Sequence, residues 1–313
     1  MEAALSSRAR ERVPVAIETA ADKLEALERT LDRAGFDAHL DAALKGAGKD
    51  PAEALVAIKP NIMGARRAEN PPFSYTDPAL VARLADRLRA AGIGDVAVVE
   101  SRVGPRSVAD VAAMAGYTSG RYQVVDLTDE MVPFDYGGVL GRAAAGRTWR
   151  DADVRISFAK NKSQWRMFYS GSLANLYGCL PEPDKLEHYS GPGHEPSECC
   201  RTILEALPVT FGIVDAWESG AWKRSVRTGA VLASPSLLAL DWVMGEKMDI
   251  DPALNPVVRE ALLRRGRVLL DRRGDETPWQ GWRNPSVAGV ALSGVLADHP
   301  WLLRRREGGW TIQ

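Results

Sequence analysis

Cysteine is scarce in this chain, and its scarcity excludes several kinds of site. The 313 residues include three cysteines, Cys179, Cys199 and Cys200. Three thiols cannot build a disulfide framework, and the vicinal pair cannot readily bridge to itself. They are also too few for a zinc or iron–sulfur site that needs four thiolates. The cysteine content favours a reducing compartment, so we expect a cytoplasmic protein without an intrinsic Fe–S cluster.

An excess of one charge and long apolar runs are absent as well. Lys and Arg number 40 and Asp and Glu 41, so the formal net charge is -1. This balance gives no overall field that would attract nucleic acid or an anionic membrane. No apolar stretch reaches the about 18 residues of a spanning helix without a charge, and the N-terminus shows no apolar signal core. We therefore expect neither a nucleic-acid nor a membrane partner.

Several well-known motifs are missing too. The sequence contains no GxxxxGK[ST], no GxGxxG after a predicted strand, no GxSxG and no CxxC. These absences disfavour a P-loop, a standard dinucleotide fold, an α/β-hydrolase elbow and thioredoxin chemistry. The chain also lacks an internal repeat, which argues against a solenoid.

Short runs rich in Val and Ile alternate with helical patterns along the chain. This order predicts an α/β fold with a mostly parallel or mixed sheet, helices on both faces, and long loops at the carboxyl ends of the strands. We expect long loops at 60–76, 130–147, 180–196 and 219–229. The predicted strands are Val13–Ile17, Ala54–Ile58, Val96–Val99, Gln123–Val125, Val154–Phe158, Val209–Val214 and Ala230–Leu232. The predicted helices are 20–34, 78–91, 107–115, 196–206, one that starts near Ser234-Pro235 and runs through Met244, and 254–265.

Ionisable residues follow several predicted strands at the point where each strand ends. They are Lys59, Glu100, Asp126, Lys160 and Asp215. Ligands of open α/β sheets bind outside the carboxyl ends of the strands, where these side chains would converge. The alternative is that each merely marks a solvated strand exit. We take the set to locate a pocket without identifying its chemistry.

Cations at this edge suggest an anionic ligand. Lys59 precedes Pro60, which favours an extended backbone and directs the ammonium beyond the strand, and Asn61 adds an amide donor. Lys160 and Lys162 follow another strand on a short segment. Lysines beside low-dielectric walls bind carboxylate or phosphate. A solvated run of charges is the alternative.

Asp241 is the most informative single residue, because it interrupts an apolar helical face between Leu237 and Met244. A buried carboxylate needs a partner. That partner is either a structural Lys or Arg or a functional cluster with Asp215 and Glu218. Asp241 together with Asp215, Glu218 and His188 would suit a divalent metal or acid–base catalysis, with Asp215, Asp241 and His188 as the candidate ligands.

The chain resembles the DUF362 family, a domain of unknown function in bacteria and archaea. The resemblance is strongest over 54–252 and predicts one α/β domain over 1–252, with 253–313 as a helical, covering segment of the same compact unit. The segments that carry it are VAIKPNI at 56–62, YTDPALVARLADRLRAAG at 75–92, VAVVES at 96–101, ISFAKNKSQ at 156–164, SLANLYGCLPEPDKLEHY at 172–189, GIVDAWES at 212–219 and ASPSLLALDWVMGEKMDIDP at 233–252.

The resemblance implies site positions but no reaction. It adds Glu100 and Asn175 to the binding residues Lys59, Asn61, Lys160 and Lys162. The chain departs from the family at Ala174, where Lys is usual, and at 219–229, which replaces a glycine-rich stretch. Many members carry ferredoxin-like cysteine clusters, and this chain has none.

Taken together, these features predict an enzyme that acts on a small anionic metabolite. An oxidoreductase is the first expectation and rests on family context alone. A metal-dependent isomerase or racemase of a hydroxy or amino acid is the second, because proton abstraction beside a carboxylate needs cations and carboxylates together. A non-catalytic ligand-binding or accessory protein is the third. The cofactor is left open, with a divalent metal as the candidate, and a homo-oligomer is compatible with the nine tryptophans.

Overall fold

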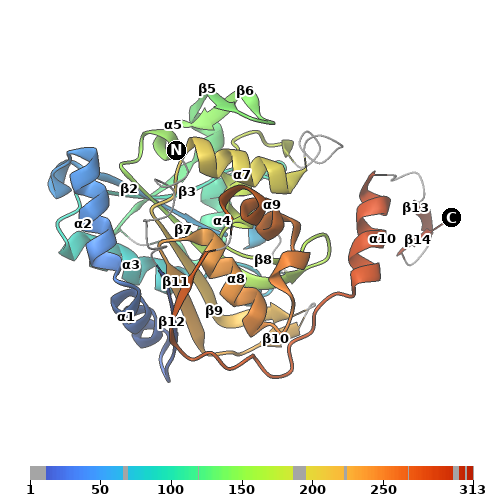
Figure 1. The fold of residues 1–313 in the computed structure, drawn as a ribbon. Helices are drawn as coiled ribbons and strands as arrows, with labels where there is room; N and C mark the ends of the chain where they lie inside the picture. The colour runs from blue at the N-terminus through green and yellow to red at the C-terminus, as the bar shows by residue number, and fades with distance from the viewer. Residues whose placement is uncertain are drawn as a thin grey trace, which may run out of the picture.

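A ten-stranded mixed sheet forms the centre of the described molecule (Figure 1). The computed structural model describes residues 12–65, 70–118, 120–185, 195–221, 224–266, 268–298, 303–306 and 309–312. The strands are β1 (Val13–Thr19), β2 (Leu55–Pro60), β3 (Asp95–Glu100), β4 (Gln123–Asp126), β7 (Val154–Gln164), β8 (Phe168–Ser170), β9 (Phe211–Ala221), β10 (Arg224–Val226), β11 (Ala230–Ser234) and β12 (Leu270–Gly274).

The sheet has the order β12-β1-β11-β9-β7-β2-β3-β4, with β8 paired to β7 and β10 to β9. The five strands from β9 to β4 are parallel to one another, whereas β11 runs antiparallel to both β9 and β1. A parallel block of this kind brings the carboxyl ends of β2, β3 and β7 to one edge. The predicted α/β class with a mixed sheet is therefore confirmed.

Helices cover both faces of the sheet, because alternate strand residues point to opposite sides. On β2, Val56 and Ile58 belong to one core and Ala57 belongs to the other. The first core is closed by α1 (Lys23–Ala34), α2 (Phe36–Ala47), α3 (Pro78–Ala90) and α4 (Val108–Ala115). The second is closed by α5 (Arg147–Asp151), the 3₁₀ turn η6 (Ala174–Cys179), α7 (Pro196–Ala206), α8 (Leu237–Lys247) and α9 (Pro256–Arg265).

Local signals set the helix ends. Asp77 caps α3 by accepting a hydrogen bond from the backbone N–H of Ala79 at 2.8 Å, and Pro78 occupies the first helical position. Helix α2 was not predicted. Gly35, with φ of 73°, is both the last residue that caps α1 and the residue before α2. The sequence therefore has no proline or longer turn that would indicate a second helix.

Two expected loops contain strands. Most of 130–147 is a hairpin of β5 (Met131–Gly137) and β6 (Gly141–Gly146). The expected loop at 219–229 contains β10. Gly137, Gly138 and Gly141 all have positive φ, so the glycines that suggested a loop form only the tight turn of the hairpin.

The C-terminal part continues the same sheet, since β12 pairs in parallel with β1. Beyond it lie α10 (Val287–Asp298) and a hairpin of β13 (Leu303–Arg306) and β14 (Gly309–Ile312). Among the described residues, no helix has the length and apolar character needed to cross a membrane.

Candidate functional site

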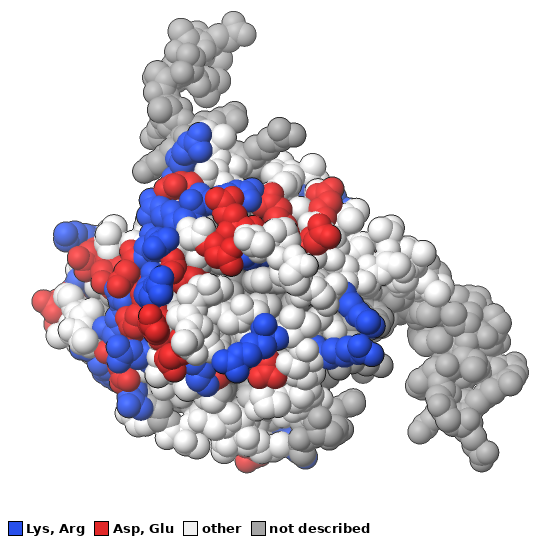
Figure 2. Space-filling model, turned by 90° about the horizontal axis from the view of Figure 1, so that it is seen from below, with Lys and Arg blue, Asp and Glu red and all other residues white. Residues whose placement is uncertain are grey.

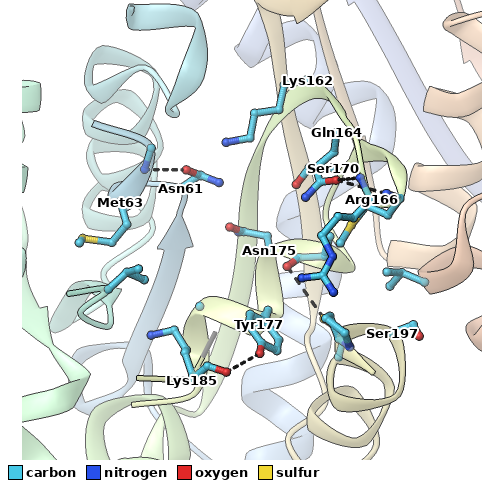
Figure 3. A pocket seen from close by; sticks show the side chains of 18 of the residues that line it. Asn61, Met63, Lys162, Gln164, Arg166, Ser170, Asn175, Tyr177, Lys185 and Ser197 are labelled. Atoms are coloured by element: carbon cyan, nitrogen blue, oxygen red, sulfur yellow. Dashed lines mark hydrogen bonds between the residues drawn. The ribbon is translucent and has the colours of Figure 1, made fainter. Parts of the chain in front are cut away.

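A cavity of about 520 Å³ opens beyond the carboxyl ends of β2, β3 and β7. Strand residues, the turn η6, the β7–β8 hairpin and the N-terminus of α7 line it (Figure 3). Five of the predicted site residues are in its wall: Lys59, Asn61, Glu100, Lys162 and Asn175. Of the five predicted strand-end residues, Lys59 and Glu100 line the cavity. Lys160, Asp215 and Asp126 are not in its wall, and Asp126 instead forms an ion pair with Arg102.

A buried ion pair forms the floor. Lys59 Nζ lies 2.9 Å from Glu100 Oε1, and both side chains are almost completely buried. Glu100 Oε2 also accepts hydrogen bonds from the backbone N–H groups of Ile62 and Met63, at 3.0 and 3.4 Å. Buried charges are tolerated when paired and hydrogen-bonded in this way. Glu100 is therefore held in place as the ion-pair partner of Lys59.

Asn175 joins η6 to the same floor. Its Nδ2 donates to the carbonyl oxygen of Lys59 at 2.7 Å, and its Oδ1 accepts from Lys59 Nζ at 3.4 Å. The neighbouring turn residue must be glycine, because a Cβ on Gly178 would lie 2.7 Å from both Glu100 Oε1 and Lys59 Nζ. The turn can approach the ion pair only without a side chain.

The opposite wall comes from the β7–β8 hairpin. Lys162 Nζ donates to the carbonyl oxygen of Ser74 at 2.9 Å. Asn61, which follows β2 on the other side of the cavity, accepts through Oδ1 from the backbone N–H of Gly64 at 3.1 Å. In Figure 3, Lys162 and Arg166 reach toward the cavity from the hairpin side. Arg166 lines the cavity and is not among the predicted site residues.

Lys185 is a pocket residue that the sequence did not assign. Its Nζ is buried and donates to Ser101 Oγ at 2.7 Å and to the carbonyl oxygens of Arg102 and Glu182 at 2.6 and 3.4 Å. Burial lowers the pKa of this ammonium to about 8. Within the described part of the chain, no carboxylate forms an ion pair with it. Its signal was its place in the family segment at 172–189.

Lys160 and Asp215 lie outside the cavity wall. They form a buried ion pair, with Lys160 Nζ 2.8 Å from Asp215 Oδ2. Asp215 also accepts hydrogen bonds from the backbone N–H groups of Asp77 and Trp217, at 2.9 and 3.1 Å. The pair therefore fixes the start of α3 against the sheet. A register shift between Lys160 and Lys162 sends the two lysines to different surroundings, although they are two residues apart on one strand.

Asp241 has a structural partner. Its carboxylate accepts hydrogen bonds from the N–H and hydroxyl of Ser172, both at 2.7 Å, and from the N–H of Leu173 at 2.9 Å. Burial raises its pKa to about 6 against the effect of these donors. The partners are therefore neither a Lys or Arg nor the cluster of Asp215 and Glu218, and these hydrogen bonds position the chain that enters η6.

The remaining predicted residues do not gather around the cavity. Glu218 accepts a hydrogen bond from Ser225 Oγ at 2.6 Å on the β9–β10 hairpin, and His188 lies outside the described residues. Asp215 and Asp241 have separate sets of hydrogen-bond donors. In the described ranges, no group of three or more His, Cys, Asp or Glu residues is placed to hold a metal ion.

The cysteines are buried thiols. Burial raises the pKa of Cys179 to about 12, so the thiol stays protonated near neutral pH. Cys200 lines the cavity and its pKa is also raised by burial. Neither fits the low-pKa environment of a catalytic nucleophile.

Comparisons with known proteins give the relationship. The thylakoid-associated protein sll1697 of Synechocystis sp. is 27% identical over 221 residues, which cover 65% of this chain and 65% of that protein. The lactate racemase apoprotein from Thermoanaerobacterium thermosaccharolyticum is similar in structure, with a TM-score of 0.47 and 12% identity, over 74% of this chain and 55% of that chain. Each match spans less than two thirds of the other protein. The model of the family described as "Domain of unknown function (DUF362)" matches residues 56–246, more than half of the 313, and the chain belongs to this family.

Proposed function

We propose that the cavity binds a small anionic metabolite that carries a carboxylate or phosphate group. The observation that carries this proposal is the charge of the wall. Among the described lining residues, the cations Lys59, Lys162, Arg166 and Lys185 face two carboxylates, Glu100 and Glu195. Glu100 neutralises Lys59, whereas the hydrogen bonds described for Lys185 Nζ all go to neutral oxygens. The excess of positive charge in a low-dielectric wall favours an anion.

The size of the cavity supports a small ligand. Its volume of about 520 Å³ falls within the roughly 300–1,000 Å³ of metabolite sites. Pro196 and Ser197, at the N-terminus of α7, also line it, and the positive end of that helix dipole adds to the attraction for an anion. The lining thus combines charged residues with apolar ones such as Met63, Val103 and Met167.

Binding can be measured with sulfate and L-lactate as probes, by isothermal titration calorimetry at low ionic strength. Lys162→Met removes a cation from the wall, and we expect the affinity to fall at least tenfold. Lys45→Met is the matched control, because Lys45 is exposed on α2 at the other face of the sheet. Saturable binding that Lys162→Met leaves unchanged would contradict the proposal, as would no binding of either probe.

A second candidate function is that of an isomerase or racemase, in which a proton is transferred at the carbon beside the bound carboxylate. The lowered pKa of Lys185 favours it, because a lysine with a pKa of about 8 is partly neutral near pH 7.5 and can accept a proton. When the Lys185 ammonium loses one proton, the neutral amine keeps two N–H donors for the three oxygens around Nζ and gains a lone pair. The test is exchange of the α-proton of L-lactate or L-alanine in D₂O, followed by NMR. Lys185→Arg keeps the charge and should abolish exchange while retaining anion binding.

The oxidoreductase and the accessory-protein readings stay predictions with their own tests. A bound chromophore absorbing between 300 and 550 nm in the purified protein would favour redox work. Anion binding without a chromophore and without proton exchange would favour a ligand-binding or accessory role. Elemental analysis of protein prepared without a chelating tag tests the divalent metal, and localisation by fractionation tests the cytoplasmic expectation.

A further inference from the structure

Helix α10 presents apolar side chains to solvent. Its sequence, VAGVALSGVLAD, contains a single charged residue, Asp298. Over 287–292, where side chains are described, Val287 is 61% and Leu292 47% exposed, and Val290 is the half-buried residue that contacts the core. Figure 1 shows α10 standing apart from the sheet and its covering helices. A helix that is apolar on all sides is normally buried.

A second apolar surface lies at the edge of the sheet. A groove with a volume of about 330 Å³ opens between α8, α9 and the edge strand β12, and every residue in its wall is apolar. The wall consists of Leu238, Ala239, Trp242, Leu262, Val268 and Leu270. Their chain neighbours Leu263 and Leu269 are 73% and 43% exposed. Contiguous exposed apolar surface of this kind marks a contact site.

The chain before α10 is tied down near the C-terminal end of α8, away from the groove. Lys247 Nζ donates to the carbonyl oxygen of Asp275 at 2.9 Å, and the Trp279 N–H donates to the carbonyl oxygen of Lys247 at 2.7 Å. Asn284 Nδ2 donates to the carbonyl oxygen of Met248 at 2.7 Å. The segment is therefore held at the C-terminal end of α8 until three residues before α10. The groove uses the N-terminal half of α8 instead.

We infer that α10 of one copy packs into the α8–α9–β12 groove of a second copy, and that the exchange is reciprocal. Each copy carries one apolar helix and one apolar groove, so a twofold dimer uses both and leaves neither exposed. Half the surface of a helix about 18 Å long and 10 Å wide is about 280 Å², so two such contacts bury at most about 1,100 Å² when both sides are counted. A specific interface needs about 1,000 Å².

The test is the mass of the full-length protein by sedimentation velocity between 1 and 100 µM. We expect a dimer of twice 34.0 kDa. Leu292→Asp, or Val287→Asp, places a carboxylate in both contacts and should raise the dimer dissociation constant at least 100-fold. Met114→Asp is the matched control, because Met114 is 47% exposed on α4 at the other face of the sheet.

A mixing experiment separates reciprocal exchange from other dimers. Leu262→Asp blocks the groove, and Leu292→Asp blocks the helix. Each variant alone should be monomeric, whereas an equimolar mixture should form a dimer of intermediate affinity, because one intact helix then meets one intact groove. Far-UV circular dichroism and the melting temperature establish that both variants are folded.

Three results would overturn the inference. The first is a monomeric wild type at 100 µM. The second is a dimer that neither Leu292→Asp nor Val287→Asp weakens. The third is a monomer that binds vesicles of phosphatidylcholine and phosphatidylglycerol through Leu292, which would assign α10 to a lipid surface.

Discussion

Asp241 Oδ1 accepts two hydrogen bonds from Ser172, one from its backbone N–H and one from its hydroxyl, each at 2.7 Å. Oδ2 accepts a third from the N–H of Leu173 at 2.9 Å. These donors lead into η6, which carries Asn175 to the floor of the cavity. A carboxylate on α8 therefore shapes the site from behind without touching it.

Replacing Asp241 with Asn should lower stability. The amide has one oxygen, so its NH₂ group would face the Leu173 N–H and leave a buried donor unsatisfied, at a cost of about 2 kcal/mol. Chemical denaturation measures this loss. Asp50→Asn is the control, because Asp50 caps an exposed turn through one N–H and Asn caps equally well. An unchanged free energy of unfolding for Asp241→Asn would contradict the structural role.

The fold was largely predictable because its strands are short runs of β-branched residues bounded by turn residues. The residues of the cavity wall were predictable where they follow a strand, as with Lys59 and Glu100. Asp241 shows the limit. Its position in an apolar face predicted that it has a buried partner. The partners include the backbone N–H groups of Ser172 and Leu173, about 70 residues away, and backbone groups carry no sequence signal.

The two lysines on β7 show a second limit. Residues 160 and 162 are expected on the same side of a strand, and both were assigned to the ligand. The register shift between them places Lys160 against Asp215 and leaves Lys162 in the cavity wall. Bulges depend on tertiary pairing, so spacing alone could not distinguish the two.

Gly178→Ala should damage the cavity. The added Cβ would lie 2.7 Å from the Lys59 and Glu100 side chains, which cannot move without breaking their buried ion pair. We expect at least a tenfold loss of sulfate affinity together with a lower melting temperature. Gly46→Ala is the matched control. A Cβ there meets nothing within 4 Å inside α2, so stability should rise by up to about 1 kcal/mol.

Asp215→Asn tests whether the Lys160–Asp215 pair is structural. The substitution leaves the Lys160 ammonium buried without its counter-charge, which costs about 3–5 kcal/mol. Lys160→Met alone leaves the opposite charge uncompensated. The double variant should be less destabilised than the sum of the two single variants, because it removes both charges. Additive losses would show that the pair is not coupled. A loss of α-proton exchange without a loss of stability would support the predicted catalytic role of Asp215.

The affinity of the cavity for sulfate should fall as the pH rises through about 8. Burial lowers the pKa of Lys185 to that value, and an anion is bound best when the amine is protonated. The sign follows from linkage: sulfate binding takes up a proton above the pKa, so the affinity declines by up to about tenfold per pH unit there. Sulfate itself does not titrate in this range, and the Cys179 thiol, with a pKa of about 12, stays protonated.

Calorimetry from pH 6.5 to 9.5 measures how the sulfate affinity depends on pH. Lys185→Met should bind more weakly at pH 7 and lose the step, and Lys185→Arg should keep the affinity up to pH 9.5 because guanidinium stays charged. A step that persists in Lys185→Met would place the titrating group elsewhere in the wall.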